Sequence, residues 1–434
     1  MSRRWVLLIF ALVVSLLSWE LLFYGEEDLW RAPQRPPATV VECDLSRHAR
    51  AVSFLGVVAR LCGQLCTASV RPSFCDRGRF LQAHGRVRFD FSQTPSADVE
   101  GEIETVDVVY VATGERFYGA GGQSYVLDSI RQWRCFHSPR ESRVFLVLDD
   151  AHVQDPRIVA LREPLGITLI PASQAVTSRL ERYRSLFYIQ GFMHPGGNRS
   201  TGNKQFNRLV TERFFVLAAV MRRLRLRHVL HVENDNMIYA NMRGVLRAIA
   251  RCGYRMASTA PSAEGFVPGV VYVKDAESVE HFADYVNDFL SCGRRFGVAV
   301  SRAVTRKRDP YANDMTYMMN YYQLFGSAYM GELPAWLHAA GENCIVESSR
   351  EMGLPPYLFD AASFGQWYSF AALDGALLPP ARIRRAARRR YLNVTPPPPL
   401  TWAAKGANRV PFWNAFRLVS LHIHAKNLRN FSSR

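Results

Sequence analysis

Apolar runs with strand character alternate with helix-like segments from about Asp107 onward, and this alternation restricts the fold more than any other feature. The runs "DVVYVA", "RVFLVL" and "ITLIP" are rich in β-branched residues, and segments with helical spacing separate them. Strands that alternate with helices pair in parallel and are covered on both faces. The sequence therefore predicts an α/β, Rossmann-like fold with a mainly parallel sheet for residues 105–434.

Further elements are expected in the same region. The stretch "TERFFVLAAVMRRLRLR" predicts a long helix with Thr211 as its N-cap. A later strand is expected at Gly269–Asp275, and a helix is expected to begin at Asn313 and Asp314. No G-x-G-x-x-G or Walker A loop occurs in the sequence. A dinucleotide site of the Rossmann type or a P-loop is therefore disfavoured.

Acidic residues follow two of the predicted strands at the points where these strands end. Asp149 and Asp150 end one strand, and "ENDN" follows the strand at Val229–Val232. Ligands of parallel sheets bind at this edge, where buried carboxylates are rare unless they are paired or hold a metal. Glu233 and Asp235 are two residues apart, which places both side chains on one side of the backbone. The pair predicts a site for Mn²⁺ or Mg²⁺, and the alternative is a solvated or capping turn.

The N-terminus predicts a membrane anchor. Basic residues in the tail 1–4 precede an apolar stretch at 5–24, which is near the length of roughly 20 residues that a helix needs to span a bilayer. No cleavage site is evident, and "GEED" follows the stretch, so the tail is expected in the cytosol and the body in the lumen. Residues 25–104 are expected to form a stem with a Cys-bearing segment. The net charge of +16 indicates which partners the chain can attract and does not restrict its fold. A body in the lumen excludes nucleic acid as a partner.

Cysteines and glycosylation motifs agree with an oxidising lumen. Some of the eight cysteines are expected to form disulfides, although their pairing is not readable from the sequence. The basic segment Arg382–Arg390 fits a solvated loop, or a surface that attracts phosphorylated glycolipid or anionic membrane. Three Asn-x-Ser/Thr motifs occur, at Asn198, Asn393 and Asn430.

The anchor, the stem and the α/β body with "HVENDNMIY" resemble the Golgi glycosyltransferases of the GT-A type. In that family an acidic-x-acidic motif binds the metal of a nucleotide-sugar. "LHIHAKN" resembles a C-terminal histidine segment of such enzymes, and "FDAASFGQWY" resembles a donor or acceptor loop. More narrowly, the Arg- and Ala-rich chain resembles the kinetoplastid galactofuranosyltransferases of lipophosphoglycan and glycolipid core synthesis. It departs from the common motif at Glu233, where Asp is usual, so Asp235 is expected to be the principal ligand.

This resemblance implies a metal-dependent transfer of galactofuranose from a UDP-sugar to a hydroxyl of a membrane glycoconjugate in the Golgi lumen. The implied partners are a nucleotide-sugar donor, a glycan or glycolipid acceptor and the Golgi membrane, with Mn²⁺ or Mg²⁺ as cofactor and inversion at the anomeric carbon. The alternatives are a transferase for another donor sugar and a non-catalytic lumenal lectin or scaffold.

The resemblance also assigns roles to single residues. Asp314 is the candidate base for the acceptor hydroxyl, with Asp360 as its rival, and an N-cap is the alternative role of Asp314. Asp149 and Asp150 would meet the nucleotide or cap a helix, and Lys426 would meet the diphosphate.

Two histidines near the C-terminus complete the candidate metal site. His422 and His424 alternate along an extended segment, so they share one face. If either binds the metal, Mn²⁺ is favoured over Mg²⁺, because imidazole is a poorer ligand for Mg²⁺. The alternative is that both are ordinary polar positions.

Overall fold

The computed structural model describes ten stretches of the chain, and all of them lie in one compact unit. These stretches are residues 103–114, 124–190, 200–262, 265–291, 313–335, 343–362, 364–365, 400–406, 408–423 and 428–433. The predicted tail and anchor lie outside them, as does the stem except for its last two residues. Within the described stretches, no helix has the length and apolar character that crossing a bilayer requires. The boundaries proposed for anchor, stem and body stay predictions.

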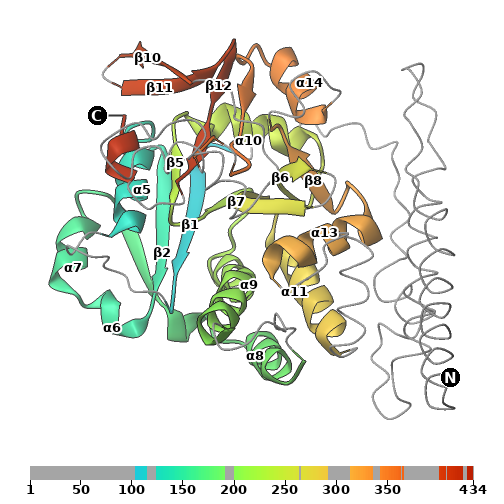
Figure 1. Ribbon diagram of the computed structural model, residues 1–434. Coiled ribbons are helices and arrows are strands. Elements are labelled where there is room, and N and C mark those ends of the chain that lie inside the picture. The colour runs from blue at the N-terminus through green and yellow to red at the C-terminus, as the bar shows by residue number, and fades with distance from the viewer. Residues whose placement is uncertain are drawn as a thin grey trace, which may run out of the picture. The chain divides into compact units, whose positions relative to one another are not determined.

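A mainly parallel central sheet forms the middle of the fold, as the alternation of strands and helices predicts (Figure 1). Its strand order in the described residues is β3-β2-β1-β4-β7-β6-β8. Only β7 runs antiparallel to its neighbours β4 and β6. The strands are β1 (Val106–Ala112), β2 (Ser142–Leu148), β3 (Ile167–Pro171), β4 (Val229–Val232), β6 (Met256–Ser262), β7 (Gly265–Val273) and β8 (Met330–Leu333).

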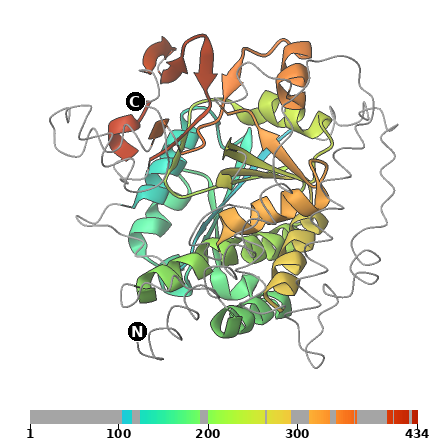
Figure 2. The same ribbon diagram turned by 45° about the vertical axis from the view of Figure 1, so that its right-hand side comes forward.

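Helices cover both faces of this sheet, as expected for a buried parallel sheet (Figures 1 and 2). In β1, Val109 and Val111 pack into one hydrophobic core, whereas Val108 and Tyr110 pack into the opposite one. The first core is completed by α8 (Ser178–Gln190), α9 (Ser200–Leu224), α11 (Ala276–Ser291) and α13 (Asp314–Phe325). The second is completed mainly by α5 (Tyr125–Arg134), α7 (Pro156–Arg162), α10 (Met242–Arg251) and α14 (Cys344–Glu351). The short α6 (Asp150–Val153) and the 3₁₀ turns Ala172–Ala175 and Leu428–Phe431 complete the described helices.

The expected start of the long helix at Thr211 is wrong. Helix α9 begins at Ser200, so Thr211 lies in its middle and is buried. The Thr211 hydroxyl donates a hydrogen bond to the Asn207 carbonyl oxygen, one turn earlier. This local bond satisfies a hydroxyl inside a helix, and for that reason a threonine need not mark a helix end.

The C-terminal part of the chain returns to the end of the central sheet. Strand β13 (Ser420–His422) pairs antiparallel with β5 (Asn236–Ile238), directly after the acidic turn. A second small sheet has the order β10-β11-β12-β9. Its strands are β10 (Thr401–Lys405), β11 (Asn408–Trp413), β12 (Phe416–Leu418) and β9 (Tyr357–Leu358).

One disulfide joins Cys252, at the end of α10, to Cys344, the first residue of α14. It agrees with the expectation that some of the cysteines are oxidised. The sequence gives no means of choosing this pair.

Candidate metal centre

The acidic stretch forms a tight turn between β4 and β5, at the carboxyl edge of the central sheet. The Glu233 amide donates to the Gly269 carbonyl oxygen at 2.9 Å, and the Asn236 amide donates back to the Glu233 carbonyl oxygen at 3.0 Å. The turn holds Glu233 and Asp235 with little exposure to solvent. Both carboxylates are therefore fixed by backbone hydrogen bonds and by the two flanking strands.

Asn234, within the same turn, contacts the neighbouring strand β1. Its carboxamide nitrogen donates to the Val111 carbonyl oxygen at 3.1 Å, which ties the turn to the end of β1. Asn234 is buried. Its role in the described structure is to hold the turn against the sheet.

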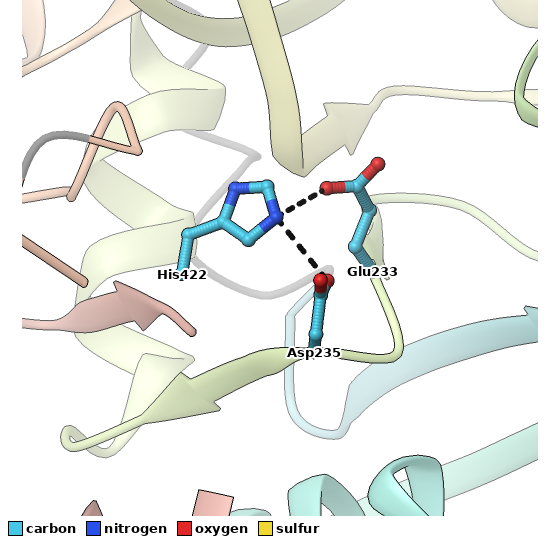
Figure 3. Close-up of side chains that lie close together, drawn as sticks. All are labelled: Glu233, Asp235 and His422. Carbon is cyan, nitrogen blue, oxygen red and sulfur yellow. Dashed lines mark ion pairs between the residues drawn. The ribbon is translucent and has the colours of Figure 1, made fainter. Parts of the chain in front are cut away.

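His422 reaches the two carboxylates from the distant C-terminal strand β13. Its Nε2 lies 3.1 Å from Glu233 Oε2 and 3.2 Å from Asp235 Oδ1 (Figure 3). The three residues offer ligand atoms that all lie within 4.8 Å of one another, and we call them the Glu–Asp–His group. Three of the four predicted metal ligands thus lie together. The fourth, His424, and the predicted diphosphate contact Lys426 lie outside the described residues.

Arg213, in the middle of α9, is a member of the site that sequence reasoning missed. Its guanidinium donates one hydrogen bond to Glu233 and another to Asp314, the first residue of α13. Arg213 is buried, and its neighbours in the sequence, "RFFVLAAV", are mostly apolar. An arginine on the apolar face of a helix is rare without an acidic partner, and this was the available signal.

The positive charges of Arg213 and His422 offset most of the negative charge of the three carboxylates in this network. Burial opposes ionisation of Glu233, but Arg213 and then His422 outweigh it and hold the pKa of Glu233 below its usual value. Burial also disfavours the imidazolium, yet Asp235 and Glu233 together raise the pKa of His422 to about 9. Burial raises the pKa of Asp314 to about 6, although Arg213 opposes this shift. A protonated His422 therefore lies between two carboxylates, where a cation is favoured.

Asp314 lies at the start of α13, but it is not the cap of this helix. The cap is Asn313, whose side-chain oxygen accepts from the Thr316 amide at 3.0 Å. Asp314 accepts from Arg213 and, at 2.8 Å, from the Met315 amide. The carboxylate is thus engaged on both oxygens and buried.

Asp360 holds a loop against the histidine strand. Its carboxylate accepts from the amides of Phe364 at 2.9 Å, Gly365 at 2.7 Å and His422 at 3.0 Å. It is almost fully buried, and burial raises its pKa. A Cβ on Gly365 would lie 2.2 Å from the His422 carbonyl oxygen, so only glycine fits here. Asp360 and Gly365 therefore fix the backbone position of His422.

Asp149 and Asp150 lie at the same sheet edge, after β2, as predicted. Asp149 accepts from the Gly114 amide at 2.7 Å, in the segment after β1. Asp150 accepts from the Ser173 amide at 3.0 Å, just after β3. Asp149 also precedes α6 as its N-cap residue, without a side-chain capping bond. Both carboxylates tie neighbouring turns of the edge together, and their contact with a nucleotide stays a prediction.

The Glu–Asp–His group has the composition that a divalent cation requires. Two carboxylates and one imidazole form a mixed oxygen and nitrogen donor set, which suits Mn²⁺ better than Mg²⁺. Replacement of the His422 proton by a divalent ion would keep the carboxylates neutralised. The residues present therefore fit such an ion.

Comparisons with known proteins give distant structural likeness only. No protein-family model and no curated protein sequence matches the chain. It is similar to apo mouse xyloside xylosyltransferase 1, with a TM-score of 0.34, 12% identity and coverage of 55% of this chain and 90% of that one. It is also similar to the apo-form glycosyltransferase GlyE of Streptococcus pneumoniae TIGR4, with a TM-score of 0.29, 10% identity and coverage of 52% and 44%. A Leptospira borgpetersenii cytidylyltransferase matches with a TM-score of 0.25, 5% identity and coverage of 42% and 64%. Such scores carry no argument about function, and the galactofuranosyltransferase resemblance stays a prediction.

Proposed function

We propose that this chain is a metal-dependent glycosyltransferase that moves a sugar from a UDP-sugar to a hydroxyl of a membrane glycoconjugate. The observation that most supports this proposal is the convergence of Glu233, Asp235 and His422 at the carboxyl edge of the central sheet. Open α/β sheets bind ligands at that edge. A buried acidic pair with an imidazole between its carboxylates is suited to hold a cation there.

In this proposal the protein supplies a fixed set of charged side chains that binds the metal ion. Asp235, Glu233 and His422 would hold Mn²⁺ or Mg²⁺, which would supply charge neutralisation for a departing diphosphate. Arg213 keeps Glu233 ionised and fixes its orientation through Oε1, whereas His422 contacts Oε2. Asp149, from the same edge, is assigned to the nucleotide.

The proton acceptor for the incoming hydroxyl is Asp314 or Asp360 in this proposal. Both are buried, and both are held by hydrogen bonds. The raised pKa of Asp314, about 6, suits a group that takes up a proton during turnover near neutral pH. The contacts of Asp360 with the backbone favour a supporting role, so Asp314 is the first candidate to test.

The finer assignment is galactofuranose as the donor sugar and the Golgi lumen as the compartment, with an inverting displacement. It is supported by the resemblance of the chain to the kinetoplastid galactofuranosyltransferases and by the apolar stretch at 5–24. The Cys252–Cys344 disulfide supports an oxidising compartment.

The test is a panel of nucleotide-sugars with the full chain, Mn²⁺ and acceptor glycans. UDP-galactofuranose should give the fastest transfer, and chelation of the metal should abolish it. Transfer from a different donor would support the glycosyltransferase activity but would replace galactofuranose as the assigned donor sugar. Glycan binding without nucleotide, and without turnover on any donor, would instead support the lectin alternative.

A further inference from the structure

Asn236 is a buried polar residue beside the Glu–Asp–His group, and its surroundings leave it unexplained. It is 0% exposed, and neither atom of its carboxamide has a hydrogen-bond partner among the described residues. A buried polar atom without a partner has lost its hydrogen bonds to water without replacing them, which destabilises the folded protein. Because Asn236 lies next to His422, its carboxamide is expected to act when a metal ion is bound at the Glu–Asp–His group.

The Asn236 carboxamide lies near Nδ1 of the His422 ring. The two residues face each other across the antiparallel pair of β5 and β13. A Cβ on Gly269 would lie 2.8 Å from Asn236 Nδ2 and 3.0 Å from His422 Nδ1, so both side chains fill the same space beside that glycine. Nε2 of the same ring faces Glu233 and Asp235 (Figure 3). The carboxamide is therefore next to the ring nitrogen that does not face the cation site.

A metal-binding histidine uses one ring nitrogen for the ion and donates the hydrogen on the other to an acceptor. That acceptor fixes the tautomer and the direction of the ring. A carboxamide offers one acceptor oxygen, and a half-turn of the group exchanges its oxygen and nitrogen.

We infer that Asn236 is a positioning residue, which accepts a hydrogen bond from Nδ1 of His422 and so directs Nε2 toward a divalent cation. This inference rests on the proposed function, because it takes the Glu–Asp–His group to be a metal site. It adds a residue that acts through His422 and does not itself touch the ion.

A double-mutant cycle tests whether Asn236 acts through His422. Mn²⁺ binding is measured by calorimetry at one pH on the full chain, for wild type, Asn236→Leu, His422→Ala and the double variant. Loss of an outer partner of a metal-bound histidine costs roughly 10- to 100-fold in affinity. We expect that loss in Asn236→Leu and no further loss from Asn236→Leu in the His422→Ala background.

Two further variants control for misfolding and for a nonspecific loss of Mn²⁺ binding. Gly269→Ala, whose Cβ would press on both Asn236 and His422, should weaken Mn²⁺ binding only where His422 is present. The matched control is Asn320→Leu in α13, because Asn320 is also 0% exposed and its carboxamide also has no partner in the described residues. Asn320→Leu should bind Mn²⁺ as the wild type does.

The outcomes separate this inference from the proposed function. If the wild type binds Mn²⁺ and Asn236→Leu binds it equally well, the role of Asn236 is overturned and the metal site stands. An equal loss with and without His422 would make Asn236 merely structural. If the wild type binds no Mn²⁺, the proposed function fails and the inference fails with it.

Discussion

Arg213 in α9 forms a buried ion pair with Asp314 at the start of α13, and through its other guanidinium nitrogen it also holds Glu233. Arg213 thus links the start of α13 to the candidate metal centre, because its guanidinium pairs with one carboxylate of each. Removal of a single partner from a buried pair leaves an uncompensated charge, which is far more costly than loss of an exposed pair.

Arg213→Met is therefore expected to destabilise the metal-free protein by about 3–5 kcal/mol. The matched control is Arg222→Met on the same helix, because Arg222 is half exposed and pairs with Glu277 and Glu280. That change should cost no more than about 1 kcal/mol. Urea unfolding of both variants measures the difference, and equal losses would show that the Arg213 network contributes no more than a surface pair.

Asp314→Asn tests the proton acceptor. The change keeps the shape of the side chain but removes a basic oxygen, so turnover should fall by about two to four orders of magnitude while UDP binding persists. The control is Asn313→Ala, which removes the α13 cap for about 1 kcal/mol but keeps the carboxylate, and it should retain turnover. Near-normal turnover of Asp314→Asn would transfer the role to Asp360 or to another group.

Gly365→Ala tests the support of His422. The new Cβ would lie 2.2 Å from the His422 carbonyl oxygen, and the strand must move to admit it. We expect weaker Mn²⁺ binding and lower activity. Gly265→Ala in β7 is the control, because nothing lies within 4 Å of the Cβ that it would add. Calorimetry that finds both variants equal to wild type would show that this contact does not position His422.

A pH dependence follows from His137, which stacks on Trp133 and accepts a hydrogen bond from the Met242 amide at 2.8 Å. Burial lowers the pKa of His137 to about 4. Between about 6.5 and 4 the unfolded chain binds the proton and the folded one does not, so stability is lost as the pH falls through this range. The loss from His137 alone should reach about 2 kcal/mol at pH 5. Urea unfolding at pH 7 and pH 5 should show a smaller pH effect in His137→Gln than in wild type, and an unchanged pH effect would contradict this account.

The sequence predicts the central sheet well because its strands are buried on both faces and read as apolar runs. The acidic pair is predicted for a local reason, since Glu233 and Asp235 are two residues apart directly after an apolar strand. Thr211 shows a limit of this approach, because a hydroxyl that bonds within its own helix looks the same in sequence as a cap.

Other parts of the site depend on contacts between distant segments. Arg213 meets Glu233 and Asp314 only after α9 and α13 pack on the same face of the sheet. Gly365 and Asp360 gain their role from the return of β13 to β5. No local spacing encodes these pairings, so the partners of these residues could not be predicted from the sequence.

The central claim is that the acidic turn exists to hold a divalent cation and a diphosphate. Asp235→Asn removes one negative charge with little change of shape, and the folded body should persist. Asn234→Ala is the neighbouring control. It should lower stability through loss of the bond to the Val111 carbonyl oxygen but leave binding nearly intact.

Calorimetry of UDP binding in the presence and absence of Mn²⁺, on wild type and Asp235→Asn, tests this claim most directly. The account predicts Mn²⁺-dependent UDP binding by the wild type and none by Asp235→Asn. Equal binding by the two proteins would contradict it, and the stretch from Glu233 to Asn236 would then be only a polar turn.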